Sequence, residues 1–165
     1  MTNYIEIGYI AGFMDGEGYV GVSKGKRDSY GLVVTITNTN FDLLKLYETK
    51  FGGKIRLIKK EEEHYKVKYH WDIANHNALS FLKLIQPFTI VKRKQIDLAI
   101  EFQEWHNQIK IIKTPEQKKK AEWYYNILKD LKKETGEKIS NNIIEEDAQE
   151  TQEPNPLEKH MNILQ

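Results

Sequence analysis

One short stretch near the start of the chain limits the possible folds more than any other. Residues 8–18 read GYIAGFMDGEG, with glycines at positions 8, 12 and 16. A spacing of four puts Gly8, Gly12 and Gly16 on one side of a helix. Each glycine in a helix interior costs about 0.5–1 kcal/mol relative to alanine, so we expect a second helix to pack closely there. The alternative is a glycine-rich turn that contains some apolar residues.

This stretch resembles a known motif. Residues 9–18, YIAGFMDGEG, are similar to the LAGLIDADG motif of the homing endonuclease family. The resemblance covers roughly residues 4–106 and implies an αββαββα core. No second copy of the motif follows, and single-motif members of this family act as homodimers. The resemblance therefore implies two glycine-rich helices that meet on a twofold axis. The expected interface residues are Gly8, Ala11, Gly12 and Asp15.

Composition excludes several classes of protein. A length of 165 residues fits one domain with a substantial core. The absence of cysteine excludes disulfides and thiolate metal sites. No apolar run approaches the roughly 20 residues needed to span a bilayer, and the N-terminus lacks the pattern of a signal peptide. We therefore expect an intracellular protein without a membrane partner, in the cytoplasm or an organelle.

The net charge of +1 conceals an asymmetry along the chain. Residues 1–133 hold 23 Lys and Arg against 16 Asp and Glu, a net charge of +7. Residues 134–165 hold 2 against 8, a net charge of −6. A basic body with an acidic tail is compatible with a polyanion bound by the body. We expect residues 1–133 to form a single domain and the tail to form short helical turns or to be disordered.

The order of patterns predicts an α+β fold with one four-stranded antiparallel sheet and additional C-terminal helices. Helices are expected over 4–16, 41–51, 91–106 and 115–133, with a further helix between Asn75 and Pro87. Two hairpins are expected, with strands at 19–24 and 31–37 and at 54–60 and 64–73. Asn40 and the segment 75–77 are the expected helix caps. The apolar side of the last helix should hold Trp123, Tyr124, Ile127, Leu128 and Leu131.

The two hairpins are expected to present a surface for double-stranded DNA. In the second hairpin Ile55, Leu57, Tyr65, Val67, Tyr69 and Trp71 should face the core, and Lys54, Arg56, Ile58, Lys60, Lys66, Lys68, His70 and Asp72 should face outward. The matching outward set in the first hairpin is Gly21, Ser23, Gly25, Val33, Thr35 and Thr37. A two-stranded ribbon can enter the major groove, where basic side chains contact phosphates and hydroxyls reach base edges. The predicted DNA-binding residues are Ser23, Lys24, Lys26, Arg27, Thr35, Thr37, Lys54, Arg56, Lys60, Lys66, Lys68 and His70. The alternative is an ordinary solvated face.

Glu17 is the first candidate for chemistry. A carboxylate is a hard oxygen ligand that suits Mg²⁺, and two Glu17 side chains would converge where symmetry-related helices end. The resemblance implies that Glu17 binds the metal, with the Gly16 carbonyl as a further ligand, and that Mn²⁺ or Ca²⁺ can take the same place. Asp15, by the same resemblance, shapes the helix end through hydrogen bonds. The alternative is that Glu17 is an ordinary helix-end acid, although the helix dipole disfavours a carboxylate there.

Two further residues are candidates through the resemblance. Asn38 matches a polar residue that orients water, and the alternative is that it shapes the turn before the next helix. Lys92 aligns with a lysine near the scissile phosphate, where its charge can stabilise developing negative charge. The alternative for Lys92 is a solvated basic helix start, and Lys94 is its nearest substitute.

The resemblance implies a homodimeric, Mg²⁺-dependent endonuclease that makes a staggered break at a long pseudo-palindromic site and promotes intron mobility. Two alternatives share the fold: an RNA maturase, whose partner is RNA, and a DNA-binding protein that does not cleave. A further alternative is a dimeric scaffold that binds DNA phosphates only, with steep salt dependence and little sequence preference.

Overall fold

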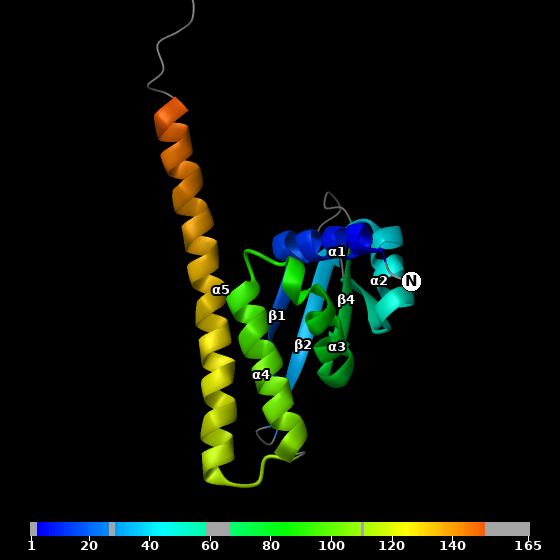
Figure 1. The fold of residues 1–165 in the computed structure, drawn as a ribbon, viewed down its shortest axis with the longest axis vertical. Coiled ribbons are helices and arrows are strands. Elements are labelled where there is room, and N and C mark those ends of the chain that lie inside the picture. The colour runs from blue at the N-terminus through cyan, green and yellow to red at the C-terminus, as the bar shows by residue number, and fades with distance from the viewer. Residues whose placement is uncertain (1–2, 27–28, 59–66, 110, 151–165) are drawn as a thin grey trace, which may run out of the picture. The chain divides into compact units, whose positions relative to one another are not determined.

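The glycine-spaced segment forms a helix, not a turn. The computed structural model describes residues 3–26, 29–58, 67–109 and 111–150, with side chains up to Lys133 (Figure 1). Helix α1 (Tyr4–Glu17) begins at Asn3, whose side chain accepts a hydrogen bond from the Ile5 amide at 3.2 Å. It ends at Gly18, whose amide donates to the Met14 carbonyl. Ile7, Ile10, Ala11 and Met14 form its buried side.

Four strands form one antiparallel sheet in the order β1-β2-β4-β3. They are β1 (Gly18–Lys24), β2 (Tyr30–Asn38), β3 (Lys54–Ile58) and β4 (Lys68–Ala74). Buried and partly exposed residues alternate along β2, because one face of the sheet packs on helices. The sequence prediction of an α+β fold with this sheet is confirmed.

The helices cover the inner face of the sheet (Figure 1). They are α2 (Phe41–Phe51), α3 (Asn75–Ile85), the short 3-10 helix η2 (Gln86–Phe88), α4 (Arg93–Ile109) and α5 (Pro115–Glu150). Trp71 at the centre of the core lies 5.1 Å from the Tyr47 ring and 5.6 Å from the Phe81 ring. None of the helices in the described residues is long and apolar enough to cross a membrane. The elements from α1 to Lys132 of α5 form one compact unit.

The structure corrects several expectations about helix ends. Asn40 caps α2 as predicted, by accepting from the Leu43 amide at 3.1 Å. The cap predicted at 75–77 is wrong: α3 begins at Asn75 after Ala74, without a side-chain cap. Helix α5 continues past Lys133 to Glu150 instead of breaking into short turns.

Four of the described residues differ from the predicted pattern of burial. Leu57, expected in the core, is 63% exposed, because β3 is an edge strand that the helices cover only in part. Val67 and Trp123 are exposed as well. Gly21, expected to face outward in the open, is buried because the Tyr19 ring lies over it. Tyr65 lies outside the described residues.

Candidate functional site

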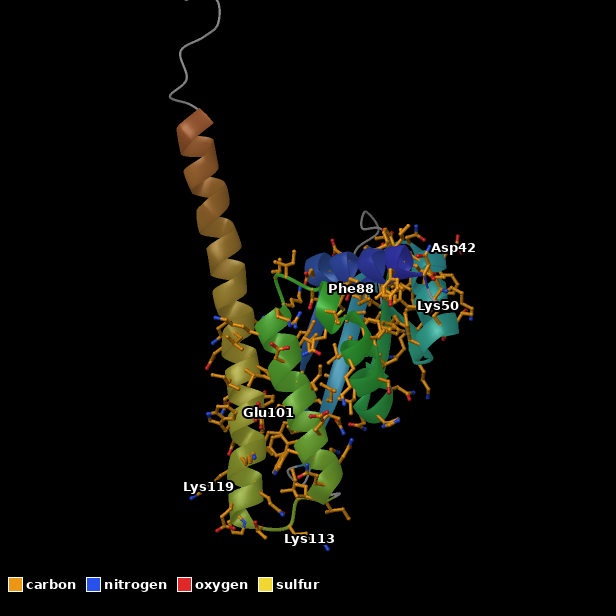
Figure 2. The ribbon with its side chains drawn as sticks, viewed as in Figure 1. Asp42, Lys50, Phe88, Glu101, Lys113 and Lys119 are labelled. Atoms are coloured by element: carbon orange, nitrogen blue, oxygen red, sulfur yellow. The ribbon has the colours of Figure 1, made fainter. Side chains whose placement is uncertain are left out.

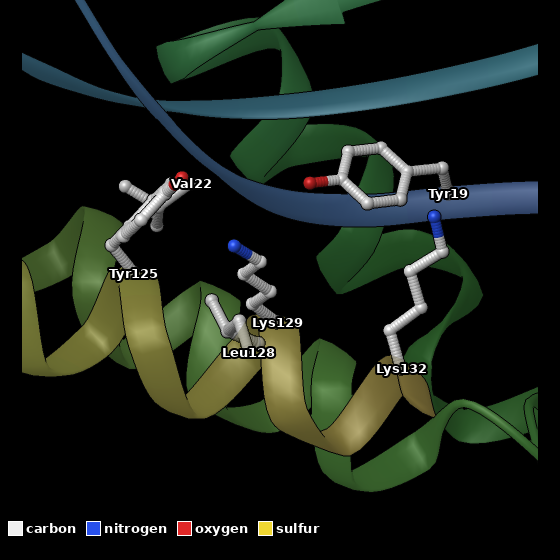
Figure 3. Close-up of a pocket in the computed structure, with 6 residues that line it drawn as sticks. All are labelled: Tyr19, Val22, Tyr125, Leu128, Lys129 and Lys132. Carbon is white, nitrogen blue, oxygen red and sulfur yellow. The ribbon is translucent and has the colours of Figure 1, made fainter. Parts of the chain in front are cut away.

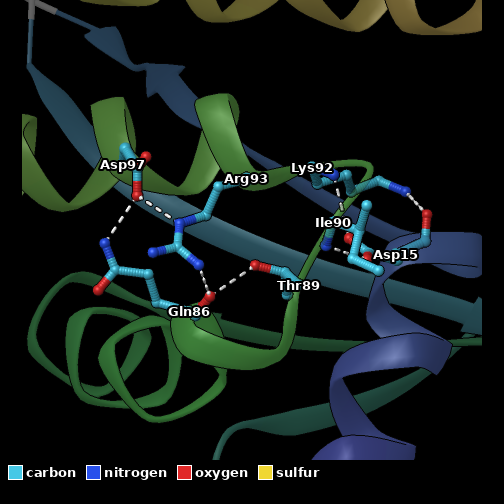
Figure 4. Close-up of polar contacts among 7 residues, drawn as sticks. All are labelled: Asp15, Gln86, Thr89, Ile90, Lys92, Arg93 and Asp97. Atoms are coloured by element: carbon cyan, nitrogen blue, oxygen red, sulfur yellow. Dashed lines mark hydrogen bonds and ion pairs between the residues drawn. The ribbon is translucent and has the colours of Figure 1, made fainter.

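The end of α1 is tied to the segment that precedes α4. The Asp15 carboxylate accepts hydrogen bonds from the backbone amides of Ile90, Val91 and Lys92, at 2.7, 3.2 and 3.0 Å (Figure 4). In return, the Lys92 ammonium group donates to the Asp15 carbonyl. Hydrogen bonds to a charged acceptor are the strong ones. These bonds are consistent with the helix-shaping role expected for Asp15, and they join residues about 75 positions apart.

This contact brings Lys92 to the end of α1, close to Glu17. Lys92 is half-buried, and burial lowers its pKa, while the nearby charges of Asp15 and Glu17 act to raise it. The Glu17 carboxylate is therefore close enough for its negative charge to favour the charged form of Lys92. Two residues that the family resemblance implies at one site are thus near each other.

Glu17 is the last residue of α1 and its side chain is exposed. No hydrogen bond or ion pair is recorded for its carboxylate among the described residues, so its oxygens are free for a ligand. Within the same residues, no three His, Asp or Glu side chains form a group that could hold a metal ion. Mg²⁺ usually keeps several waters and takes only one or two carboxylates plus phosphate oxygens. The donor chemistry of Glu17 therefore fits Mg²⁺.

Asn38 lies at the end of β2 and shapes the turn that follows. Its side-chain oxygen accepts a hydrogen bond from the Asn40 amide at 2.8 Å. That contact matches the turn-shaping alternative, and it leaves the side-chain nitrogen as the group that could hold a water.

The outer face of the sheet carries a set of polar side chains joined across the strands. Thr37 and His70 are directly opposite, and the threonine hydroxyl lies 2.7 Å from His70 Nδ1. The Asp72 carboxylate accepts hydrogen bonds from the Arg56 guanidinium at 2.7 Å and from the Thr35 hydroxyl at 3.5 Å. Each contact joins neighbouring strands, so the side chains are held in fixed positions. The role of Asp72 as the partner of Arg56 was missed in the sequence, because the strand register decides which residues face each other.

The remaining predicted DNA-binding residues are distributed more widely. Lys54 and Lys68 are exposed on the same outer face, and the Ser23 hydroxyl donates to the Gly31 carbonyl at 3.1 Å. Lys24 does not belong to this face: it pairs with Glu122 of α5 at 2.8 Å, and that hydrogen bond raises its pKa. Lys26 is exposed at the turn after β1. The predicted residues Arg27, Lys60 and Lys66 lie outside the described residues.

The glycine row of α1 faces outward. A Cβ atom added at Gly8, Gly12 or Gly16 would find no atom within 4 Å among the described residues. Ile5 and Tyr9 on the same side of the helix are exposed. The structure therefore leaves a small-residue row with apolar neighbours uncovered.

Two residues assigned to the predicted interface do not share this row. Ala11 is fully buried, because it belongs to the side of α1 that also buries Ile7, Ile10 and Met14. Asp15 points to the segment before α4. Sequence reasoning missed Ile90, which is 85% exposed, and Val91 beside it. In the sequence, the only indication of this exposed pair is that Ile90 and Val91 directly precede the basic run Lys92–Lys94.

Comparisons with known proteins agree with this architecture. The structure is similar to that of the homing endonuclease I-CvuI in complex with its target in the presence of calcium, with a TM-score of 0.63, 16% identity, and coverage of 77% of this chain and 82% of the other. It is similar to the archaeal intron-encoded homing endonuclease I-Vdi141I complexed with DNA, with a TM-score of 0.60, 24% identity, and coverage of 77% and 84%. For the homing endonuclease I-TnaI the TM-score is 0.56, the identity 21%, and the coverage 78% and 97%. At these identities the similarities establish the fold.

A search of curated protein sequences gave no significant match. The sequence model of the LAGLIDADG endonuclease family, however, matches residues 10–106. This range is more than half of the chain, and it includes the end of α1, all four strands and Lys92. The chain therefore belongs to the LAGLIDADG endonuclease family.

Proposed function

We propose that the protein is a homodimeric homing endonuclease that cuts double-stranded DNA at a specific site. The observation that carries the proposal is the uncovered glycine row of α1, which ends at the free carboxylate of Glu17. Three helix glycines that contact no other part of the described chain gain nothing for its stability unless another molecule packs on them. A second copy of α1 would cover the row on a twofold axis and bring two Glu17 side chains together.

The outer face of the sheet is the proposed DNA-binding surface. It is left free by the helices, and it carries Lys54, Arg56 and Lys68 beside the Thr37–His70 pair. Arg56 is already oriented by Asp72, and an oriented guanidinium is suited to bidentate contact with guanine in the major groove. The fold neighbours I-CvuI and I-Vdi141I were both solved with DNA, which supports the same class of partner.

A twofold dimer would present two such faces in inverted order. Its binding site would then be a long, pseudo-palindromic sequence with one half-site for each protomer. Cutting the two strands at offset positions on either side of the centre, across the minor groove, would give a staggered break. In the homing endonucleases of this family a break in the intron-less allele promotes intron mobility, and we extend this role to the present protein.

The chemistry proposed is hydrolysis of one phosphodiester bond in each strand. Glu17 would hold Mg²⁺, with the Gly16 carbonyl and phosphate oxygens as further ligands; Mn²⁺ or Ca²⁺ could take the same place. When bound, the ion lowers the pKa of a water and stabilises charge on the phosphate. The neighbouring structures solved with calcium and with magnesium support a divalent ion.

Two residues of the chain itself would assist. Lys92, fixed by its bonds to Asp15, would place its ammonium group beside the phosphate and stabilise negative charge that develops there. Asn38 would hold a water through its side-chain nitrogen, since its oxygen is bonded to the Asn40 amide.

The test is cleavage of a plasmid that carries the intron-less allele of the host gene. With Mg²⁺ the protein should convert the plasmid to a single linear product, and with a chelator the plasmid should stay intact. Binding of the same plasmid without cleavage in Mg²⁺ would instead support the non-cleaving DNA-binding alternative. If the protein neither binds nor cleaves the plasmid, the proposal is contradicted altogether.

A further inference from the structure

A cleft of about 230 Å³ lies between the edge strand β1 and helix α5 (Figure 3). It is lined by Tyr19, Val22, Tyr125, Leu128, Lys129 and Lys132. The apolar residues come from both elements, and two lysines from successive turns of α5 provide the positive charge. The cleft thus combines an apolar floor with two cations and two phenol groups.

The two lysines are held by aromatic rings and not by acids. The Lys132 ammonium lies 5.0 Å from the centre of the Tyr19 ring, and that of Lys129 lies 6.0 Å from the centre of the Tyr125 ring. Neither has a carboxylate within ion-pair distance among the described residues. By contrast, Lys24 on the neighbouring strand is paired with Glu122. A ring contact positions an ammonium group without neutralising it, so the cleft holds two positive charges that an anion could meet.

The position of Tyr19 connects the cleft to the outer face of the sheet. Tyr19 is opposite Thr35, in the row of residues that faces outward, and only two positions after Glu17. Burial, and then the nearby Tyr125, raises the pKa of Tyr19, so its hydroxyl stays protonated near neutral pH and can donate a hydrogen bond. An anion at this edge would therefore meet two ammonium groups and a phenol donor beside the proposed DNA-binding face.

We propose that Lys129 and Lys132 of α5, with Tyr19, form a phosphate-binding site that extends the DNA-binding surface beyond the edge of the sheet. The ligand is the backbone of the same duplex that the sheet reads, so the inference rests on the proposed function. Its contribution is independent of sequence, because phosphates carry no base information. In this proposal, DNA phosphates take the place that a carboxylate would take in an ion pair with Lys129 or Lys132.

The test measures how binding of a random-sequence 30-base-pair duplex depends on KCl. Each phosphate contact contributes about 0.9 to the slope of log K against log salt. The variant Lys129→Gln/Lys132→Gln should therefore reduce the slope by about 1.8 for each protomer bound. The variant Lys129→Arg/Lys132→Arg keeps both charges and should retain the wild-type slope, which separates the loss of charge from a disturbed fold.

The matched control is Lys119→Gln/Lys120→Gln, which removes the same charge from the same helix. Lys120 is also held by rings, at 5.2 Å from Trp105 and 5.9 Å from Tyr124, but on the side of α5 that faces α4. This control should leave the slope unchanged. Equal slopes for the wild type and the Lys129/Lys132 variant, or equal reductions in that variant and the control, would overturn the inference.

A second measurement needs no variant. Lysine acetylation of the wild type, read by mass spectrometry, should show protection of Lys129 and Lys132 when the duplex is bound and no protection of Lys120. Wild-type protein that binds the duplex and leaves Lys129 and Lys132 equally reactive contradicts only the phosphate site. Wild-type protein that does not bind duplex DNA at all contradicts the proposed function, and this inference with it.

Discussion

A single carboxylate determines the geometry at the end of α1. Asp15 accepts hydrogen bonds from the three backbone amides of residues 90–92. These bonds hold the backbone of the exposed Ile90–Val91 pair and of Lys92 against the end of α1. Because Lys92 is placed by this contact, the relation between Lys92 and Glu17 depends on Asp15 although Asp15 itself has no free oxygen for a metal. Two neighbouring acids of one motif therefore serve different purposes: one organises the site and the other remains available.

Replacing Asp15 should cost stability. Asp15→Ala removes the acceptor for three amides, and we expect a loss of about 1–2 kcal/mol in the free energy of unfolding. Asp15→Asn keeps one acceptor oxygen and should lose less. Urea denaturation measures both. Asp42→Ala, at an exposed acid in the first turn of α2, should change stability by no more than about 0.5 kcal/mol; an equal loss in Asp15→Ala and Asp42→Ala would contradict the bracing role of Asp15.

At the scale of elements, α4 and α5 form a pair that packs beside β1. Glu101 lies on α4, where Figure 2 labels it. Its carboxylate accepts a hydrogen bond from the Tyr124 hydroxyl of α5 at 2.6 Å, and the Tyr124 ring lies 5.5 Å from the Phe102 ring. The Lys24–Glu122 pair joins α5 to β1. A helix along an edge strand also covers backbone groups that would otherwise pair with another chain. Helix α5 thus protects the edge of the sheet and extends its surface.

Helix α4 contains a histidine that makes stability depend on pH. Burial lowers the pKa of His106, whose ring lies 5.6 Å from Phe102, below its ordinary value of 6.5. The unfolded chain therefore binds more protons than the folded one as the pH falls below 6.5, and the folded state loses stability over that range. In His106→Asn this part of the pH dependence should disappear in urea denaturation at a series of pH values. A wild-type curve that is flat below 6.5, or one that His106→Asn does not alter, would contradict the assignment.

Element order was predictable from the sequence, whereas contacts between distant segments were not. The hairpins follow from alternating side chains at positions 31–37 and 67–73, and α2 from the cap at Asn40. Nothing in local pattern links Asp15 to Ile90, since their contact exists only after η2 turns the chain back towards α1. Leu57 was misassigned for a related reason: alternation gives its face correctly, but the extent of helix cover over an edge strand is a tertiary property.

At the scale of the whole molecule, the central feature is the outward-facing glycine row of α1, which ends beside the exposed carboxylate of Glu17. Among the described residues, no atom lies within 4 Å of a Cβ added at Gly8, Gly12 or Gly16. In the proposed dimer, a second copy of α1 would cover this row on a twofold axis and bring the two Glu17 carboxylates together. The proposal therefore places the interface and the active site at the same helix.

The interface can be tested without disturbing the fold. Because a side chain at Gly12 meets open space, Gly12→Ala should leave the protomer as stable as the wild type or more stable, by about 0.5–1 kcal/mol. Gly12→Leu should fold as well but should hold two α1 helices apart, so sedimentation velocity should show a dimer for the wild type and a monomer for Gly12→Leu. Lys119→Leu, an exposed position on α5, should remain dimeric. A wild type that sediments as a monomer at all concentrations would contradict the proposed interface.

Strand cleavage by Glu17→Gln tests the central claim most directly. The substitution keeps the size of the side chain and removes the charge that a divalent ion requires. On the plasmid with the intron-less allele, in Mg²⁺, the account predicts that Glu17→Gln binds the site as the wild type does and yields no linear product. Cleavage by Glu17→Gln at the wild-type rate would contradict it, because the metal-binding carboxylate would then have to lie elsewhere in the molecule.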